Sequence, residues 1–139
     1  MSKVEHCLGD LVMGPAHVGF VVPDLGEAID RAVQMYGIDP LAVDYQPAPG
    51  VASPTRFAFF TVGGLLFEYI EPCSDEFKEL MLGDACGAGG INHVAWRVSD
   101  IALAVEILAQ RGIAPGYVTP DGIVDIGAKR MVYLDPATT

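Results

Sequence analysis

The stretch Ala16-His-Val-Gly-Phe-Val-Val-Pro-Asp-Leu25 returns 76 residues later as Asn92-His-Val-Ala-Trp-Arg-Val-Ser-Asp-Ile101. Each copy has the pattern of an apolar strand with a histidine at its second position, followed by an aspartate suited to cap a helix. Apolar residues at helical spacing follow each aspartate, and Gly37 and Gly112 end the two helical patterns. Such a repeat indicates a duplicated supersecondary unit whose copies share a core.

Further strands follow each predicted helix. A short strand is predicted over 41–45, and two strand-like runs over 56–62 and 65–70 are joined by Gly63-Gly64, which is a hairpin signal. A surface helix is predicted over 74–82. In the second copy, strands are predicted over 117–119 and 129–134, where Arg130-Met-Val-Tyr-Leu repeats Arg56-Phe-Ala-Phe-Phe.

These elements predict an α+β fold in which two tandem β-α-β-β-β modules form a curved mixed sheet around a cleft. Module 1 covers about residues 14–82, a Gly/Ala-rich linker covers about 83–90, and module 2 covers about 91–139 of one single domain. The counterpart of Glu68 in module 2 falls past Thr139. We therefore expect the last strand of module 2 to be missing from the chain as given.

The composition excludes several classes of function. The chain has 139 residues, of which 51% are apolar and 19% are charged, so it can build a hydrophobic core. Its formal charge of -10 argues against nucleic acid and against an anionic membrane surface as partners. The sequence shows no membrane span and no signal peptide, so a cytoplasmic location is expected. Three widely spaced cysteines predict neither a disulfide framework nor a cysteine metal site.

Three residues stand out as candidate metal ligands: His17, Glu68 and His93. The two histidines occupy equivalent positions of the repeat, and Glu68 lies within the apolar run 65–70. A carboxylate buried there needs a compensating cation, and imidazole and carboxylate together suit Zn, Co, Ni, Mn or Fe. Taken singly, a histidine in an apolar strand is usually a core residue, and a glutamate in a strand usually faces solvent. The repeated position of the histidines favours the metal hypothesis.

The two repeat stretches and Phe67-Glu-Tyr-Ile-Glu-Pro72 resemble the vicinal oxygen chelate superfamily, which includes glyoxalase I, methylmalonyl-CoA epimerase, extradiol dioxygenases and bleomycin resistance proteins. The segment around His93 is most similar to the methylmalonyl-CoA epimerase branch. The resemblance implies a divalent metal held by His17, Glu68 and His93, with a fourth glutamate ligand that would lie past Thr139. It also implies that Glu at position 68 is typical of glyoxalase I, whereas the epimerase often has Gln.

The resemblance implies a metal-dependent isomerase or epimerase that stabilises the enolate of a small acyl thioester, such as a CoA ester. We expect Asp44 as a candidate catalytic base and Arg97 as a candidate partner for an anionic substrate group; a solvated loop aspartate and a structural salt bridge are the alternatives. A glyoxalase I-type lactoylglutathione lyase, which would isomerise a glutathione hemithioacetal to a glutathione thioester, is a second hypothesis. A metal-free protein that sequesters a small molecule is a third. An open sheet edge also predicts a homodimer.

Overall fold

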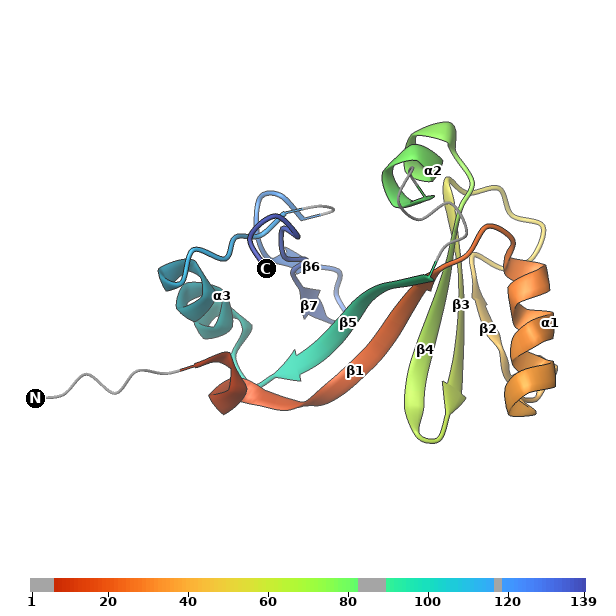
Figure 1. Ribbon diagram of the computed structural model, residues 1–139, viewed down its shortest axis with the longest axis horizontal. Coiled ribbons are helices and arrows are strands. Elements are labelled where there is room, and N and C mark those ends of the chain that lie inside the picture. Colours follow the sequence, from red (N-terminus) through yellow and green to blue (C-terminus); the bar gives the residue numbers. More distant parts are fainter. Residues whose placement is uncertain (1–6, 83–89, 117–118) are drawn as a thin grey trace, which may run out of the picture. The chain divides into compact units, whose positions relative to one another are not determined.

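The computed structural model describes residues 7–82, 90–116 and 119–139 (Figure 1). The predicted linker lies almost entirely outside these residues. Contacts divide the chain into two compact units, which are described separately below. The first, called here the sheet unit, is Pro15–Trp96, and the second unit is the chain up to Gly14 together with Arg97–Thr139. The mixture of helices with a mixed sheet confirms the predicted α+β class.

The sheet unit is built on five strands in the order β2-β3-β4-β1-β5. Strand β1 (Val12–Val21) runs parallel to β4 (Leu65–Pro72), while β3 (Thr55–Val62) is antiparallel to both β4 and β2 (Asp44–Gln46). Strand β5 (Gly90–Val98) is the neighbour of β1 at the edge of the sheet. The first strands of the two predicted modules are therefore adjacent in one sheet.

The hairpin between β3 and β4 is confirmed at the predicted glycines. Gly63 and Gly64 have φ angles of 56° and 82°, and Val62 pairs with Leu65 across the turn. A two-residue hairpin turn with positive φ at both positions matches the right-handed twist of the strands, and glycine adopts it without steric cost. The turn fixes the register of β4, and so the face on which each of its side chains lies.

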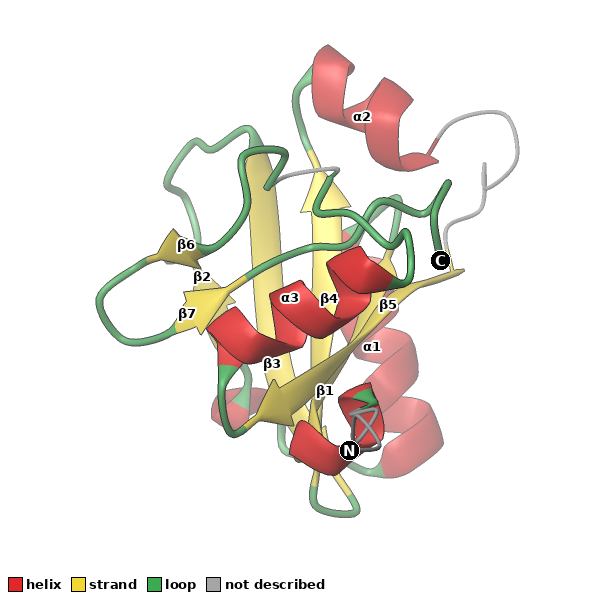
Figure 2. Ribbon diagram, turned by 90° about the vertical axis from the view of Figure 1, so that its left-hand side faces the viewer, coloured by secondary structure: helices red, strands yellow, loops and turns green. Residues whose placement is uncertain are grey.

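Helix α1 (Leu25–Tyr36) begins and ends where the sequence predicts. The Asp24 side chain accepts a hydrogen bond of 2.8 Å from the Glu27 N–H, and Gly37 ends the helix in the left-handed conformation with φ 66°. The helix lies against one face of the sheet (Figure 2). Its buried stripe packs on the small Ala58 and the large Phe60 and Tyr69, and consists of Leu25, Ala28, Ile29 and Ala32.

The segment after α1 departs from the predicted strand over 41–45. Residues Pro40–Ala42 form the 3-10 turn η2, and the strand β2 begins only at Asp44. Asp39 accepts a hydrogen bond of 2.9 Å from the Leu41 N–H, and proline at the first position of the turn favours it. Helix α2 (Asp75–Leu82) follows β4 close to the predicted range, with the Ser74 hydroxyl accepting from the Phe77 N–H.

The order strand, cap and helix of β1, Asp24 and α1 recurs along the chain from β5, and the cap and helix of this second copy lie in the second unit. This unit contains the 3-10 turn η1 (Leu8–Leu11) and helix α3 (Ile101–Gln110), which Asp100 caps by accepting from the Leu103 N–H at 3.0 Å. Asp24 and Asp100, which are equivalent in the sequence repeat, therefore perform the same local task.

The later strands of the second unit are shorter than predicted. Strand β6 (Val124–Asp125) pairs with β7 (Arg130–Met131), and Pro115 forms an isolated bridge with Leu134. The predicted strand over 117–119 lies mostly outside the described residues. Turns interrupt this segment, with Gly122 and Gly127 at φ 107° and 86°. In the described parts of the chain, no helix combines the length and the apolar character needed to cross a membrane.

Candidate metal centre

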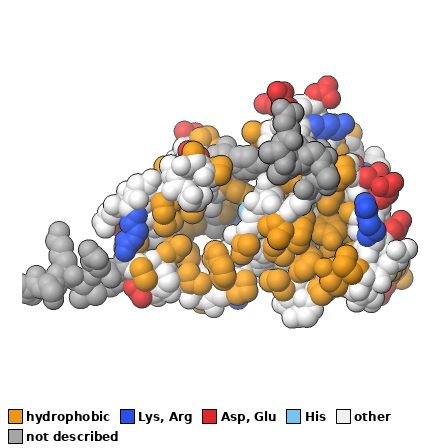
Figure 3. Space-filling view, viewed as in Figure 1, with side chains coloured by type: hydrophobic (Ala, Val, Ile, Leu, Met, Phe, Trp, Pro, Cys, Tyr) orange, Lys and Arg blue, Asp and Glu red, His pale blue; other side chains and the backbone are white. Residues whose placement is uncertain are grey.

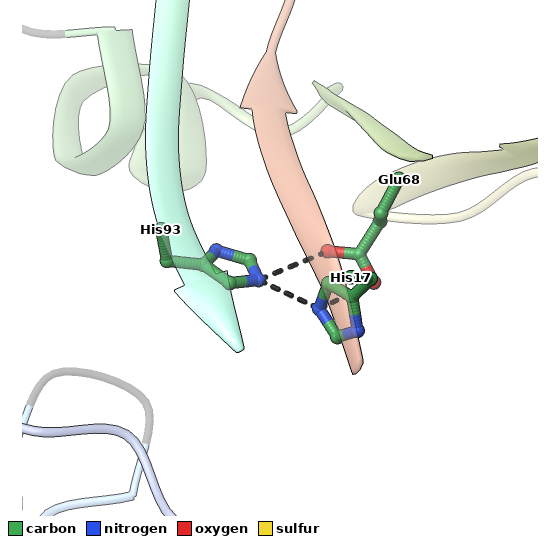
Figure 4. A group of neighbouring side chains, drawn as sticks. All are labelled: His17, Glu68 and His93. Atoms are coloured by element: carbon green, nitrogen blue, oxygen red, sulfur yellow. Dashed lines mark hydrogen bonds and ion pairs between the residues drawn. The ribbon is translucent and has the colours of Figure 1, made fainter. Parts of the chain in front are cut away.

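His17, Glu68 and His93 converge within the sheet unit (Figure 4). They come from β1, β4 and β5, and their donor atoms all lie within 4.8 Å of one another. His17 Nε2 and His93 Nε2 are 2.9 Å apart, His93 Nε2 is 3.5 Å from Glu68 Oε1, and His17 Nε2 is 3.8 Å from Glu68 Oε2. Residues far apart in the sequence thus present two imidazole nitrogens and a carboxylate to one point.

Strand alternation explains why these side chains share a face. Phe20 and Tyr69 pack toward α1, so the residues next to them, Gly19 and Glu68, lie on the opposite face of the sheet. Gly19 pairs with Glu68 across β1 and β4, and His17 lies two residues before Gly19 on the same face. The helix-packed core therefore fixes the orientation of the carboxylate and of the first imidazole.

Gly19 provides the space for the second imidazole. A Cβ built on Gly19 would lie 2.3 Å from His93 Cε1 and 2.7 Å from both ring nitrogens. Because any larger residue would occupy the position of the ring, glycine is the residue that lets His93 reach Glu68. This role was not predicted from the sequence, although a glycine in the middle of an apolar strand is a known signal for close approach.

Asn92 orients His93. Its side-chain Oδ1 lies 2.8 Å from His93 Nδ1, and an amide oxygen only accepts hydrogen bonds. With a metal ion on Nε2, the Nδ1–H of His93 would donate to this oxygen. A hydrogen bond on the far nitrogen of a histidine is the usual way in which proteins fix the ring of a metal ligand.

The three residues fit a divalent metal. Bonds of about 2.1 Å to a single ion separate two ligands by roughly 3.4 Å in a tetrahedral site and roughly 3.0 Å in an octahedral one. The observed donor separations of 2.9, 3.5 and 3.8 Å fall around these values. The side chains of His17, Glu68 and His93 are only 12%, 8% and 15% exposed, so a cation there would be shielded from water by protein on most sides.

The other two predicted site residues lie elsewhere. Asp44 is on β2, exposed, and accepts a hydrogen bond of 3.0 Å from the Gln46 side chain. It pairs with Phe59, which in turn pairs with Glu68, so Asp44 shares a cross-strand row with the candidate ligand. Arg97 is exposed and belongs to the second unit, where a guanidinium nitrogen lies 3.6 Å from a Cβ built on Gly14.

Tyr69 lies behind the site, in the core beneath α1. Burial raises the pKa of its phenol above the ordinary value, the nearby Tyr36 raises it further, and Arg31 opposes the shift. The neutral phenol is therefore the form that this core holds, and it packs edge-to-face on Phe60 with ring centroids 4.9 Å apart. The backbone that carries Glu68 is thus held on its other side by a close-packed aromatic cluster.

Solved structures with the same fold include methylmalonyl-CoA epimerases. That of Mycobacterium tuberculosis is 21% identical to this chain with a TM-score of 0.66, covering 99% of this chain and 85% of that one. A variant of the Streptomyces coelicolor epimerase bound to 2-nitronate-propionyl-CoA is 17% identical, with a TM-score of 0.66, covering 91% and 88%. A hypothetical protein from Bacillus halodurans is 20% identical, with a TM-score of 0.65, covering 89% and 85%.

At these identities the likeness establishes the fold. No curated protein matches the sequence. The family model described as the Glyoxalase/Bleomycin resistance protein/Dioxygenase superfamily matches residues 16–133, which include all three candidate ligands. The chain therefore belongs to the glyoxalase/bleomycin resistance/dioxygenase superfamily.

Proposed function

We propose that the chain binds one divalent metal ion through His17, Glu68 and His93 and isomerises a small acyl thioester through its enolate. The observation that carries the proposal is the convergence of three donor atoms within 4.8 Å of one another. A divalent ion held there would supply a Lewis acid for two neighbouring substrate oxygens. The epimerase fold of the solved structures, one of them bound to a propionyl-CoA analogue, supports a thioester as the substrate class.

Within this proposal, Asp44 takes the substrate proton. The C–H bond beside the thioester carbonyl breaks, the proton moves to the Asp44 carboxylate, and the electron pair is delocalised onto the carbonyl oxygen. A water molecule then donates a proton to the opposite face of the carbon, which gives the epimer, and Asp44 releases its proton to the solvent. Two strand spacings, about 10 Å of sheet, separate Asp44 from Glu68 along their shared row, in which Phe59 lies between them.

The proposal is tested by solvent exchange. The metal-loaded chain is incubated with methylmalonyl-CoA in D2O, and deuterium at the carbon beside the carbonyl is followed by mass spectrometry. We expect metal-dependent incorporation that the His17→Ala variant abolishes and that Asp44→Asn slows by about 100-fold or more. Thr61→Ala, on an exposed position of β3, is the control and should exchange at the wild-type rate. A metal-loaded wild-type chain without incorporation would contradict the proposal for this substrate.

A glyoxalase I-type lyase is the second candidate, because the central ligand is the carboxylate of Glu68. In the resemblance described above, glutamate at this position is typical of glyoxalase I. The metal-loaded chain is then given the hemithioacetal of methylglyoxal and glutathione, and thioester formation is followed by absorbance. Turnover here without exchange of methylmalonyl-CoA would favour the lyase over the epimerase.

A metal-free binding protein is the alternative from a different class. Elemental analysis of the purified chain separates it from both enzymes. About one equivalent of Zn, Co, Ni, Mn or Fe supports the metal enzymes. A chain that contains no metal, and whose melting temperature is unchanged on metal addition, supports the binding protein instead.

A further inference from the structure

The face of the sheet around the candidate metal centre is largely apolar. Phe59 pairs with Glu68 across β3 and β4, so the two side chains are direct neighbours on one face. One row further along, Phe57 pairs with Ile70, and Ile70 pairs with Val21 of β1. On the sides of β3 and of the following row, the carboxylate of Glu68 is therefore bordered by aromatic and aliphatic side chains.

Phe57 and Phe59 form a continuous aromatic surface. Their rings are stacked at an interplanar angle of 17°, with centroids 6.3 Å apart, and both side chains are partly exposed. Figure 3 views the sheet unit from the side rather than onto this face, and shows hydrophobic side chains in the middle of the unit with acidic side chains at its margins. An aromatic surface next to a polar centre can contact a second, apolar part of the same ligand.

Among the described residues of the sheet unit, this face offers no lysine or arginine to an anionic group; Arg97, which strand alternation places on the same face of β5 as His93, belongs to the second unit. None of the strand positions described on the metal-site face of the sheet unit is Lys or Arg. Arg56 lies on β3 between Thr55 and Phe57, so alternation directs it to the other face, and Arg31 on α1 is 3.8 Å from Glu27. An anionic substituent placed over Phe59 would meet Asp44 and Glu68 without a compensating side chain on these strands, which is unfavourable.

We infer that the substrate carries an aromatic or branched alkyl substituent beside its two metal-binding oxygens, and that Phe59 and Phe57 seat this group. The inference rests on the proposed metal centre and refines its substrate class. It makes Phe59 a specificity-determining residue, because Phe59 is the nearest apolar neighbour of Glu68 in the register. The chain then prefers thioesters whose substituent is larger than the methyl group of methylmalonyl-CoA.

Two hydroxamic acids test this inference without knowledge of the natural substrate. Acetohydroxamate and benzohydroxamate bind metals through the same two oxygens and differ in carrying methyl or phenyl next to them. The affinity of each is measured by titration of the Co²⁺-loaded chain, and the same pair is titrated against free Co²⁺ to correct for intrinsic chelation. The corrected preference is the ratio of the two affinities for the chain divided by the same ratio for free Co²⁺. We expect it to favour benzohydroxamate by about 10-fold.

Variants test whether the preference for benzohydroxamate depends on the aromatic surface of Phe57 and Phe59. Phe59→Ala should reduce the corrected preference to about 2-fold or less while leaving Co²⁺ stoichiometry and acetohydroxamate affinity unchanged, and Phe59→Leu should keep part of it. Thr61→Ala changes the residue two positions after Phe59 on the same face of β3, and should keep the full corrected preference. Equal corrected affinities for the two probes, or a preference that survives in Phe59→Ala, would overturn the inference while leaving the metal centre intact. A chain that binds no Co²⁺ would overturn both.

Discussion

Replacement of Gly19 by alanine tests the geometry of the metal centre without touching a ligand. The new Cβ would lie 2.3 Å from His93 Cε1, whereas ordinary contact begins at 3.4 Å, so the ring must retreat by about 1.1 Å. Metal–ligand bonds tolerate only about 0.2 Å of displacement. The His93 ligand is therefore lost or badly strained in the Gly19→Ala variant.

We expect the affinity for Zn²⁺ or Co²⁺ to fall by at least about 100-fold in this variant. The metal-free fold should tolerate the change, because His93 is partly exposed and can rotate outward, and because alanine in a strand is about 0.5–1 kcal/mol more favourable than glycine. Isothermal titration calorimetry measures the affinity, and thermal unfolding with and without metal measures the stability of each form.

Gly26→Ala is the matched control. Gly26 lies exposed in the first turn of α1, where a Cβ would be no closer than 3.4 Å to Asp24 Oδ1. This variant should stabilise the protein slightly and bind metal as the wild type does. In a double-mutant cycle, Gly19→Ala should have little further effect on affinity in a His93→Ala background. Wild-type metal affinity in Gly19→Ala would refute the argument, as would an equal loss in Gly26→Ala.

Three further predictions concern the orientation of the His93 ring, the stability of the fold and the oligomeric state of the chain. Asn92→Ala removes the acceptor for His93 Nδ1 and should lower metal affinity by about 10-fold, whereas Asn92→Asp keeps an acceptor and should retain most of it; calorimetry measures both. Ile29→Ala opens the core beneath α1 and should reduce the free energy of unfolding by about 2–5 kcal/mol, measured by urea denaturation, with one equivalent of metal still bound to the folded form. The chain should also run as a homodimer in light scattering, at about twice its 14.7 kDa mass, and Trp96→Glu on the exposed face of the edge strand β5 should shift it toward the monomer; a monomeric wild-type chain would contradict this prediction.

Much of the fold was accessible from the sequence because its signals are local. The caps at Asp24 and Asp100, the end of α1 at Gly37 and the hairpin at Gly63-Gly64 each depend on residues within one turn of the chain. The segment over 41–45 was predicted wrongly as a strand throughout, because Asp39 and Pro40 favour a tight turn that apolar alternation does not reveal.

The site was only partly accessible. The repeat placed His17 and His93 at equivalent positions, and the apolar run around Glu68 marked its carboxylate. The supporting residues were missed, because their roles depend on pairing between strands distant in sequence. Gly19 matters because it faces Glu68 across β1 and β4 and lies under the His93 ring, and Phe59 matters because it faces Glu68 from β3.

An anomalous diffraction experiment on Co²⁺-loaded crystals tests the central claim most directly. We expect one strong peak per chain, about 2.0–2.2 Å from His17 Nε2, His93 Nε2 and a carboxylate oxygen of Glu68. Crystals in which the two imidazoles and the carboxylate only contact one another, with the cobalt peak bound elsewhere or absent, would contradict it.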